Sequence, residues 1–212
     1  MKRWTLVVAL AGPLAWGGAA SAHVPYFERQ DYSQHRPFGV ASVTQSIAVY
    51  AWLSVRDGRS DDVDVYRFKL RKPTRVYVHV LVPVLERHKD FRPAFAVVGP
   101  GLPQPDGPLP FAVPEGCGAA LIEHAKGDEE RPTFYEPFGG KRYFKGPVFD
   151  RELKEAGEYF VFFWDPDQKG GDYVAVLGYR ETWGLLDIIR ALIHTPLIRL
   201  GWELHDEAEE AE

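Results

Sequence analysis

Hydrophobic and polar residues alternate along residues 63–98, and the rest of the chain is organised around this stretch. Aromatic residues share one face of the segment 63–70, and four valines share one face of the segment 75–82. Period-two alternation of β-branched and aromatic residues predicts strands that are covered on at least one face. The short polar link 71–74 predicts an antiparallel hairpin, and the largely apolar second segment predicts a central strand.

The same alternation predicts further strands along the chain. They lie at residues 44–53, 95–98, 158–164 and 172–179. Many short strands, together with 17 Pro and 20 Gly, are typical of a β-sandwich rather than of long helices. Residues 150–156 (DRELKEA) are expected to form at most two helical turns before a glycine. We therefore expect a mainly β fold, an antiparallel β-sandwich over residues 23–180 with a short C-terminal helical appendage.

Tyrosines recur in these strands in a recognisable pattern. It runs Asp64-x-Tyr66-x-Phe68, Gly157-x-Tyr159 and Gly171-Asp172-Tyr173. The pattern resembles bacterial pre-peptidase C-terminal domains and their jelly-roll relatives, and the whole chain resembles uncharacterised bacterial exported proteins. The resemblance implies a small exported, jelly-roll-like sandwich, mostly without catalysis, that accompanies or binds other molecules. The proline-rich insertion 99–118 departs from the family pattern, and we expect it to be functional or to cover one edge of the sandwich.

Composition places the chain among globular proteins and argues against one class of partner. Hydrophobic residues make up 45% and charged residues 26% of the 212 positions, enough for one domain with its own core. The formal net charge is −5, and loss of Lys2 and Arg3 with an N-terminal leader would make it −7. Nucleic-acid phosphates require basic surfaces, so we expect no nucleic-acid partner. The acidic end, 206–212, is expected to be disordered.

Residues 1–22 have the pattern of a secretory signal peptide. A basic start, a short apolar run (TLVVALAGPLAW) and the small residues Ala20-Ser21-Ala22 follow one another. We expect cleavage after Ala22 and export to the periplasm or the extracellular space. An N-terminal membrane anchor is the alternative, and the shortness of the apolar run argues against it.

Cleavage at this position would make His23 the first residue, which suggests a copper site. A free α-amino group and its own imidazole chelate one ion, and a second imidazole completes a three-nitrogen set that suits Cu(II). Such a site resembles the histidine brace of copper oxygenases and copper carriers. The candidate second ligands are His35, His79 and His124, and the sequence does not choose among them. The alternative is a solvated terminal histidine without metal.

Acidic residues in a late loop suggest a calcium site. Asp165, Asp167 and Asp172 offer the oxygen ligands that Ca²⁺ prefers, and the loop begins like an EF-hand. However, Lys169 stands in the place of the third acid and Val176 in the place of the bidentate glutamate. The alternative is an acidic turn exposed to water.

The densest aromatic segment, 134–144, surrounds a Gly-Gly turn and predicts a hairpin. Its aromatic and charged side chains are candidates for a surface that stacks on a sugar or clamps a peptide. They are Phe134, Tyr135, Glu136, Phe138, Lys141, Arg142 and Tyr143. The alternative is that these rings fill the core of the sandwich, since aromatic side chains gain most from burial.

The chain changes character near its C-terminus. Apolar residues at helical spacing predict amphipathic helices within 181–205, and Thr195-Pro196 predicts the start of a second helix. Charged residues interrupt the segment, so we expect no transmembrane span. Residues 183–205, which include Trp183 and Trp202, are expected to pack on the sandwich, to dock another protein or to lie on a membrane surface.

Catalytic signatures are missing from the sequence. It contains no nucleophile elbow, zinc-binding helix, phosphate loop or dinucleotide fingerprint. Cys117, the only cysteine, has no internal partner and no nucleophile signature around it, which leaves pairing between two chains. We therefore expect an exported, non-enzymatic binding or structural module of unknown ligand. The alternative function is a periplasmic copper-binding protein that uses His23.

Overall fold

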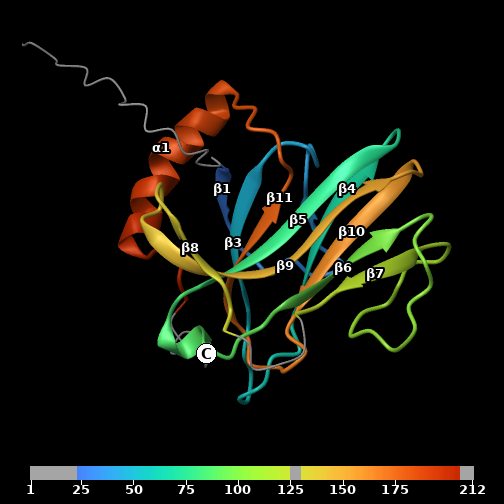
Figure 1. Ribbon diagram of the computed structural model, residues 1–212, viewed down its shortest axis with the longest axis horizontal. Helices are drawn as coiled ribbons and strands as arrows, with labels where there is room; N and C mark the ends of the chain where they lie inside the picture. The colour runs from blue at the N-terminus through green and yellow to red at the C-terminus, as the bar shows by residue number, and fades with distance from the viewer. Residues whose placement is uncertain (1–22, 125–129, 206–212) are drawn as a thin grey trace, which may run out of the picture.

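Two β-sheets pack face to face, and one helix lies against the outside of the larger sheet (Figure 1). The computed structural model describes residues 23–124 and 130–205, and these residues contain eleven strands. The expected signal peptide, 1–22, and the acidic end, 206–212, lie outside the described residues. The prediction of a mainly β sandwich with a short C-terminal helical appendage is confirmed.

The larger sheet has six strands among the described residues, in the order β1-β3-β11-β5-β9-β8. In that order, the strands are Val24–Phe27, Ile47–Leu53, Gly171–Leu177, Thr74–Pro83, Lys141–Leu153 and Thr133–Glu136. Neighbouring strands run antiparallel except β1 and β3, which are parallel. The aromatic segment forms the predicted hairpin, since β8 and β9 pair on either side of the Gly-Gly turn.

The smaller sheet has five strands among the described residues, in the order β2-β4-β10-β6-β7. In that order, the strands are Phe38–Gly39, Val63–Leu70, Gly157–Trp164, Ala94–Gly99 and Gly118–Ile122. Here β2 and β4 are the parallel pair. Both sheets are therefore mixed, and the predicted antiparallel pairing holds away from these two edge pairs. A short 3₁₀ turn, Glu86–His88, follows β5.

The expected hairpin between residues 63–70 and 75–82 is wrong, because the two strands belong to different sheets. β4 pairs along its whole length with β10, and β5 pairs with β11 and β9. The link between them crosses from one sheet to the other, so Phe68 and Val78 both join the core between the sheets. The central position predicted for the second strand is confirmed, since β5 lies between β11 and β9.

The expected helical turns at residues 150–156 are also absent. The residues up to Leu153 extend β9 into a strand of 13 residues. β5 supplies the partner strand as far as Thr74, opposite Leu153. Across this pair, Arg75 donates to both carboxylate oxygens of Asp150 at 2.7 Å. Pairing with a distant strand therefore overrides the local helical pattern.

The recurring tyrosines belong to the core between the sheets. Tyr66, Tyr159 and Tyr173 are all buried. The hydroxyls of Tyr66 and Tyr173 lie 3.1 Å apart, and Tyr173 donates to Asp64 at 2.7 Å. Buried hydroxyls need hydrogen-bond partners, and the pattern supplies them within the core. Core packing therefore accounts for these tyrosines without a ligand.

The proline-rich insertion between β6 and β7 closes the outer face of the smaller sheet. Leu109, Phe111 and Val113 pack on this face. The ring of Phe111 stacks on Phe162 with 3.9 Å between the centroids, and it meets Trp164 edge-on at 5.5 Å. The insertion thus covers a face of the sandwich rather than the edge that the sequence suggests.

The outer face of the larger sheet is covered by α1, Leu185–Leu200 (Figure 1). α1 is one continuous helix, whereas the sequence predicts a new helix at Thr195-Pro196. Pro196 removes one backbone donor from the helix, but contacts of His194 and Ile198 with the sandwich hold the chain on both sides of it. Among the described residues, no helix has the length and apolar character needed to span a membrane.

Candidate functional site: a cavity beneath the C-terminal helix

α1 rests on the sandwich through its polar residues. The contacts are those of Asp187 with the side chain of Gln45 (2.9 Å), Arg190 with the ring of Tyr26 (4.1 Å) and His194 with the ring of Phe27 (4.5 Å). Tyr26 and Phe27 belong to β1, and Gln45 precedes β3. The polar side of the helix is therefore fixed along one edge of the larger sheet.

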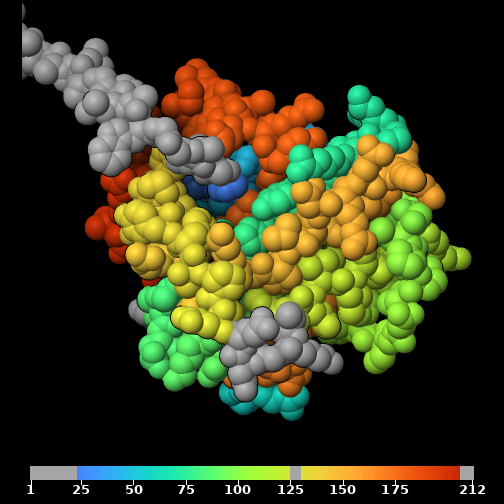
Figure 2. Space-filling view, in the orientation of Figure 1, coloured from blue at the N-terminus to red at the C-terminus, as the bar shows by residue number. Residues whose placement is uncertain are grey.

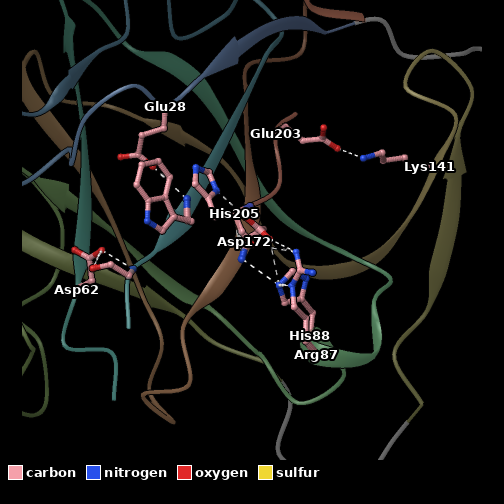
Figure 3. Close-up of polar contacts among 10 residues, drawn as sticks. Glu28, Asp62, Arg87, His88, Lys141, Asp172, Glu203 and His205 are labelled. Atoms are coloured by element: carbon pink, nitrogen blue, oxygen red, sulfur yellow. Dashed lines mark hydrogen bonds and ion pairs between the residues drawn. The ribbon is translucent and has the colours of Figure 1, made fainter. Parts of the chain in front are cut away.

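Asp172 is the polar anchor beyond the end of the helix (Figure 3). This residue is 3% exposed, and its carboxylate lies 2.8 Å from His205 Nδ1, 3.0 Å from Arg87 and 3.3 Å from His88 Nε2. Burial acts to raise the pKa of Asp172, but hydrogen bonds from His205 and Arg87 outweigh it and lower the pKa. The His205 ring also stacks on Trp52 with 3.7 Å between the centroids. These contacts fix the chain that leaves α1 to the sandwich.

Two further contacts tie this end of α1 to the β8–β9 hairpin. Glu203, which is buried, pairs with Lys141 (Figure 3). Arg199 donates to the backbone oxygen of Phe138 at 2.8 Å. The helix is thus held by β1 along one side and by the hairpin at its C-terminal end.

Held in this way, α1 leaves a cavity of about 850 Å³ between itself and the sheet. Its lining is mainly apolar and includes Ala48, Leu81, Val174 and Val176 from the sheet, Ile188 and Leu192 from the helix, and Phe134 and Phe138 from the hairpin. Figure 2 shows residues of the N-terminal strand (blue) in the recess between α1 (orange) and β8 (yellow). Within α1, which is described throughout, Ile198 is the one buried residue. The helix therefore packs into the sheet through Ile198, and its other residues are half-buried or exposed.

Glu136, His23 and Tyr143 are among the polar side chains of the cavity wall. Glu136 accepts hydrogen bonds from two backbone N–H groups of the hairpin turn, at 2.5 and 2.8 Å. His23 Nδ1 lies 2.5 Å from the hydroxyl of Ser46. The buried hydroxyl of Tyr143 lies beside that of Tyr50 but makes no hydrogen bond of good geometry among the described residues. Burial raises the pKa of Tyr143, so this hydroxyl stays neutral at physiological pH.

Most of the residues predicted to form a binding surface line this one cavity. They are Phe134, Tyr135, Glu136, Phe138, Tyr143 and Trp183. The other three lie outside its lining: Lys141 pairs with Glu203, Arg142 lies over the ring of Tyr135, and Trp202 is 71% exposed after the helix. Four aromatic rings of the hairpin thus face a hollow beside the sheet, whereas Phe144 packs against the core between the sheets.

The structure brings two of the candidate copper ligands, His23 and His79, to the same face of the larger sheet. His23 lines the cavity, and His79 lies on β5 beside Val176, which also lines it. His79 Nε2 is buried and has no hydrogen-bond partner in the described part of the chain. Burial lowers the pKa of His79 to about 4, with smaller contributions from Lys145 and from His23. His79 is therefore a neutral imidazole at physiological pH.

The other two histidines lie elsewhere. His35 is exposed in a turn after β1, and His124 follows β7 of the smaller sheet. Burial, together with Arg131, lowers the pKa of His124 to about 4. Across residues 23–124 and 130–205, no group of three or more His, Cys, Asp or Glu side chains is placed to hold a metal ion. A metal at His23 would therefore need a backbone nitrogen among its ligands.

In the acidic loop predicted to bind calcium, the carboxylates of Asp165 and Asp172 make hydrogen bonds within the protein. Asp165 accepts backbone hydrogen bonds from Asp167, Lys169 and Gly170 at 2.7 to 3.0 Å. A carboxylate that binds the following N–H groups stabilises a tight turn. Asp172 is held by cationic side chains, as described above, and Asp167 is exposed. Asp165 and Asp172 therefore have structural roles.

The structure brings together two buried acids, Glu28 and Asp64, which the sequence-based predictions do not pair. They are 8% and 1% exposed. Glu28 accepts the backbone N–H of Trp52 at 3.1 Å, and burial and the neighbouring Asp64 raise the pKa of Glu28 to about 10. Burial also raises the pKa of Asp64. The sequence does contain a signal for this pair, since alternation places Asp64 on the same strand face as the core residues Tyr66 and Phe68.

Comparisons with known proteins do not identify a family. No protein-family model matches the chain, and no curated protein matches it. The resemblance to pre-peptidase C-terminal domains therefore stays a prediction. A function has to be argued from the chemistry of the site rather than from the fold.

Proposed function

We propose that the protein is an exported, non-enzymatic binding protein that takes up one small apolar molecule beneath α1. The observation that carries this proposal is the apolar cavity of about 850 Å³ under a helix held only at its side and end. Small-molecule sites typically measure about 300–1,000 Å³ and are lined mainly by apolar and aromatic side chains. The volume and the lining of this cavity both agree with that class.

The physical cost of an empty cavity supports the same conclusion. Protein interiors are close-packed, and apolar atoms that line a void lose their contacts on one side. Here Leu192 lines the cavity from the helix but is 71% exposed, so most of its side chain lacks an apolar partner. An apolar molecule would restore these contacts, and its binding to the folded state would stabilise the protein by mass action.

Tyr143 indicates what the ligand carries besides its apolar surface. A buried hydroxyl without a good hydrogen bond costs about 1–3 kcal/mol, and that of Tyr143 makes none among the described residues. A ligand with one hydrogen-bonding oxygen or nitrogen would remove this cost. We therefore propose a largely apolar ligand with a single hydrogen-bonding group, in the class of long-chain alcohols, esters and amides.

Val176 and Val148 offer a matched test of this site. Both lie beside His79 on one face of the larger sheet. Val176 lines the cavity, whereas Val148 is 46% exposed and lies outside its lining. Val176→Trp would place a large ring in the cavity, and Val148→Trp would add the same ring to the surface.

Binding of the uncharged fluorescent probe N-phenyl-1-naphthylamine gives the measurement. We expect one-to-one binding by the natural protein and by Val148→Trp. Binding by Val176→Trp should be at least about tenfold weaker, a loss of about 1.4 kcal/mol. Circular dichroism establishes that both variants are folded. Equal affinity in all three proteins, or no binding by the natural protein, would contradict the proposal.

A second candidate function, copper binding, rests on the position of His79. Its buried Nε2 has no partner in the described residues, and it lies on the same sheet face as His23. If the leader is removed after Ala22, the α-amino group and ring of His23 together with His79 offer three nitrogens. We propose that this set takes Cu(II), which prefers nitrogen ligands in a tetragonal arrangement.

A titration with Cu(II) separates this function from the first. The protein is prepared to begin at His23, and the control carries one extra alanine before His23. We expect one-to-one binding with a nitrogen-rich EPR spectrum, weakened at least about tenfold in the control and in His79→Ala. Equal binding in all three proteins, or none, would remove copper and leave the apolar-ligand function standing.

A further inference from the structure

The side of α1 that faces away from the sandwich is apolar. The polar residues Asp187, Arg190 and His194 contact the β1 edge instead of solvent. Outside the lining of the cavity, the exposed side chains are Leu185 (74%), Leu186 (76%), Ile189 (45%) and Ile193 (57%). A surface helix of a globular protein normally turns its apolar stripe to the core and its polar face to water. In α1, apolar residues both line the cavity and face solvent, whereas the polar residues are turned to the β1 edge.

This apolar surface continues into the mouth of the cavity. Leu192 and Leu200 line the cavity and are nevertheless 71% and 73% exposed. Phe138, on the opposite wall, lines the cavity and is 47% exposed. Large exposed apolar patches mark interaction sites. The outer surface of α1 and the opening of the cavity therefore form one continuous patch, which we name the α1 patch.

We propose that the α1 patch docks on a lipid bilayer, so that the apolar ligand passes between the membrane and the cavity without crossing water. This inference rests on the proposed apolar-ligand function and names the partner of the same site. A helix with one apolar side lies in the bilayer interface with that side buried among the headgroups and acyl chains. Trp202, 71% exposed just after the helix, is a residue type enriched at that interface.

A second copy of the chain fits the patch less well than a bilayer does. Stable protein interfaces use about 20–30 residues from each partner. The patch offers about ten large exposed side chains, from α1, Trp202 and the β8–β9 hairpin. A dimer built on this patch would also cover the mouth of the cavity. A bilayer needs only the apolar side of one helix and supplies apolar molecules at the mouth.

Charge indicates how the patch should bind. α1 contains no lysine, and its two arginines are engaged, Arg190 with the Tyr26 ring and Arg199 with the Phe138 oxygen. Attraction to anionic lipids requires a cluster of basic residues near the surface. We therefore expect membrane binding through apolar contact, with little dependence on anionic lipid or on salt.

Co-sedimentation with phosphatidylcholine vesicles tests the docking. The test variant is Leu186→Glu/Ile189→Glu, on the outer side of α1 and outside the cavity lining. The matched control is Leu121→Glu/Val148→Glu, which places the same charges at two apolar positions, 44% and 46% exposed, outside α1 and the cavity lining. We expect the natural protein and the control to bind, and the test variant to bind at least about tenfold more weakly.

Further measurements distinguish a failure of the membrane docking from a failure of the proposed ligand binding. Binding should be nearly the same with 30% phosphatidylglycerol added and at about 0.1 or 0.5 M salt, since screening acts on charges. In vesicle-free buffer, all three proteins should bind N-phenyl-1-naphthylamine equally. If the probe binds but vesicles do not, the docking is wrong and the proposed function stands. A natural protein that is dimeric by analytical ultracentrifugation and ignores vesicles would assign the patch to a second copy and overturn the inference.

Discussion

The two sheets of the sandwich each have an apolar outer face, and the chain covers the two faces in opposite ways. On the smaller sheet, the proline-rich insertion lies directly on the strands, with the Phe111 ring stacked on Phe162 at 3.9 Å. On the larger sheet, α1 is held at its side and end and leaves a cavity of about 850 Å³. One face is sealed by packing, and the other is roofed over an open space.

This difference shows where the fold gives up stability. A sealed apolar face gains from burial and dispersion along its length, whereas the roofed face packs on its helix through Ile198 and leaves other apolar roof residues, such as Leu192, exposed. The roof exposes a second row of apolar residues on its other side, with Leu186 at 76%. Departures from consistent packing are expected at functional sites. The roofed face is thus the side of the molecule on which binding is expected.

We expect the largest difference in unfolding free energy when one residue is truncated on the outer face of each sheet. Phe111→Ala removes a stacked ring from the sealed face, and we expect a loss of about 2–3 kcal/mol because Phe111 is half-buried. Leu192→Ala removes a cavity-lining side chain that is 71% exposed, and we expect a change within about 0.5 kcal/mol. The free energy of unfolding in urea measures both. A large loss for Leu192→Ala would mean that α1 packs tightly and that the cavity is closed in solution.

The free energy of unfolding should also decrease as pH rises, because of a buried acid on the side that carries α1. Glu28 follows β1, on which α1 rests, and its pKa is raised to about 10 from 4.5 by burial and by Asp64. The folded state therefore keeps a proton that the unfolded chain releases above pH 4.5. The stability from this proton is fully present below pH 4.5 and falls by up to about 1.4 kcal/mol per pH unit towards pH 10.

Glu28→Gln tests this dependence, because glutamine resembles the protonated carboxyl and does not titrate. We expect the unfolding free energy of the variant to fall less between pH 7 and 9 than that of the natural protein. Glu158→Gln, whose side chain is 53% exposed, serves as the control and should follow the natural protein. Parallel pH profiles for Glu28→Gln and the natural protein would show that Glu28 titrates normally.

Local patterns in the sequence predict the strands but not which strands pair. Period-two alternation identifies the segments that become β4 and β5, because the side-chain period is a property of each strand alone. Their pairing depends on β10 and β11, which lie about a hundred residues further along, and it places the two in different sheets. Asp150 illustrates the same limit. Its local sequence predicts a helical turn, but it lies in a strand and makes a bidentate contact with Arg75 on the partner strand.

The candidate site shows a second limit. Composition makes the aromatic hairpin and Trp183 a candidate binding surface, and most of these residues line one cavity. The cavity itself depends on the distance between α1 and the sheet, which no local pattern encodes. Helical spacing reveals that α1 has an apolar stripe, but not the direction in which it faces. Here Arg190 and His194 find aromatic partners on β1, and the stripe faces outward.

The smallest predicted effect concerns two buried tyrosine hydroxyls. Tyr159 lies beside the proline-rich insertion, and Tyr143 lies beside the cavity under α1. Tyr159 donates to the backbone oxygens of Pro100, at the start of the sealing insertion, and of Glu155, at 2.9 and 3.0 Å. Tyr159→Phe should therefore cost about 1 kcal/mol of unfolding free energy. The Tyr143 hydroxyl makes no hydrogen bond of good geometry among the described residues, so Tyr143→Phe should be neutral or stabilising by up to about 1 kcal/mol.

Ligand binding should reverse the order of these two variants. Since the Tyr143 hydroxyl is proposed to contact the polar group of the ligand, Tyr143→Phe should weaken binding of a long-chain alcohol by about three- to tenfold. Tyr159→Phe should leave that affinity unchanged, because its hydroxyl contacts Pro100 at the start of the proline-rich insertion. Isothermal calorimetry measures both affinities, and denaturant unfolding without ligand measures both stabilities. A Tyr143→Phe variant that loses stability yet keeps its affinity would mean that the hydroxyl serves the fold and that the ligand contact lies elsewhere in the cavity.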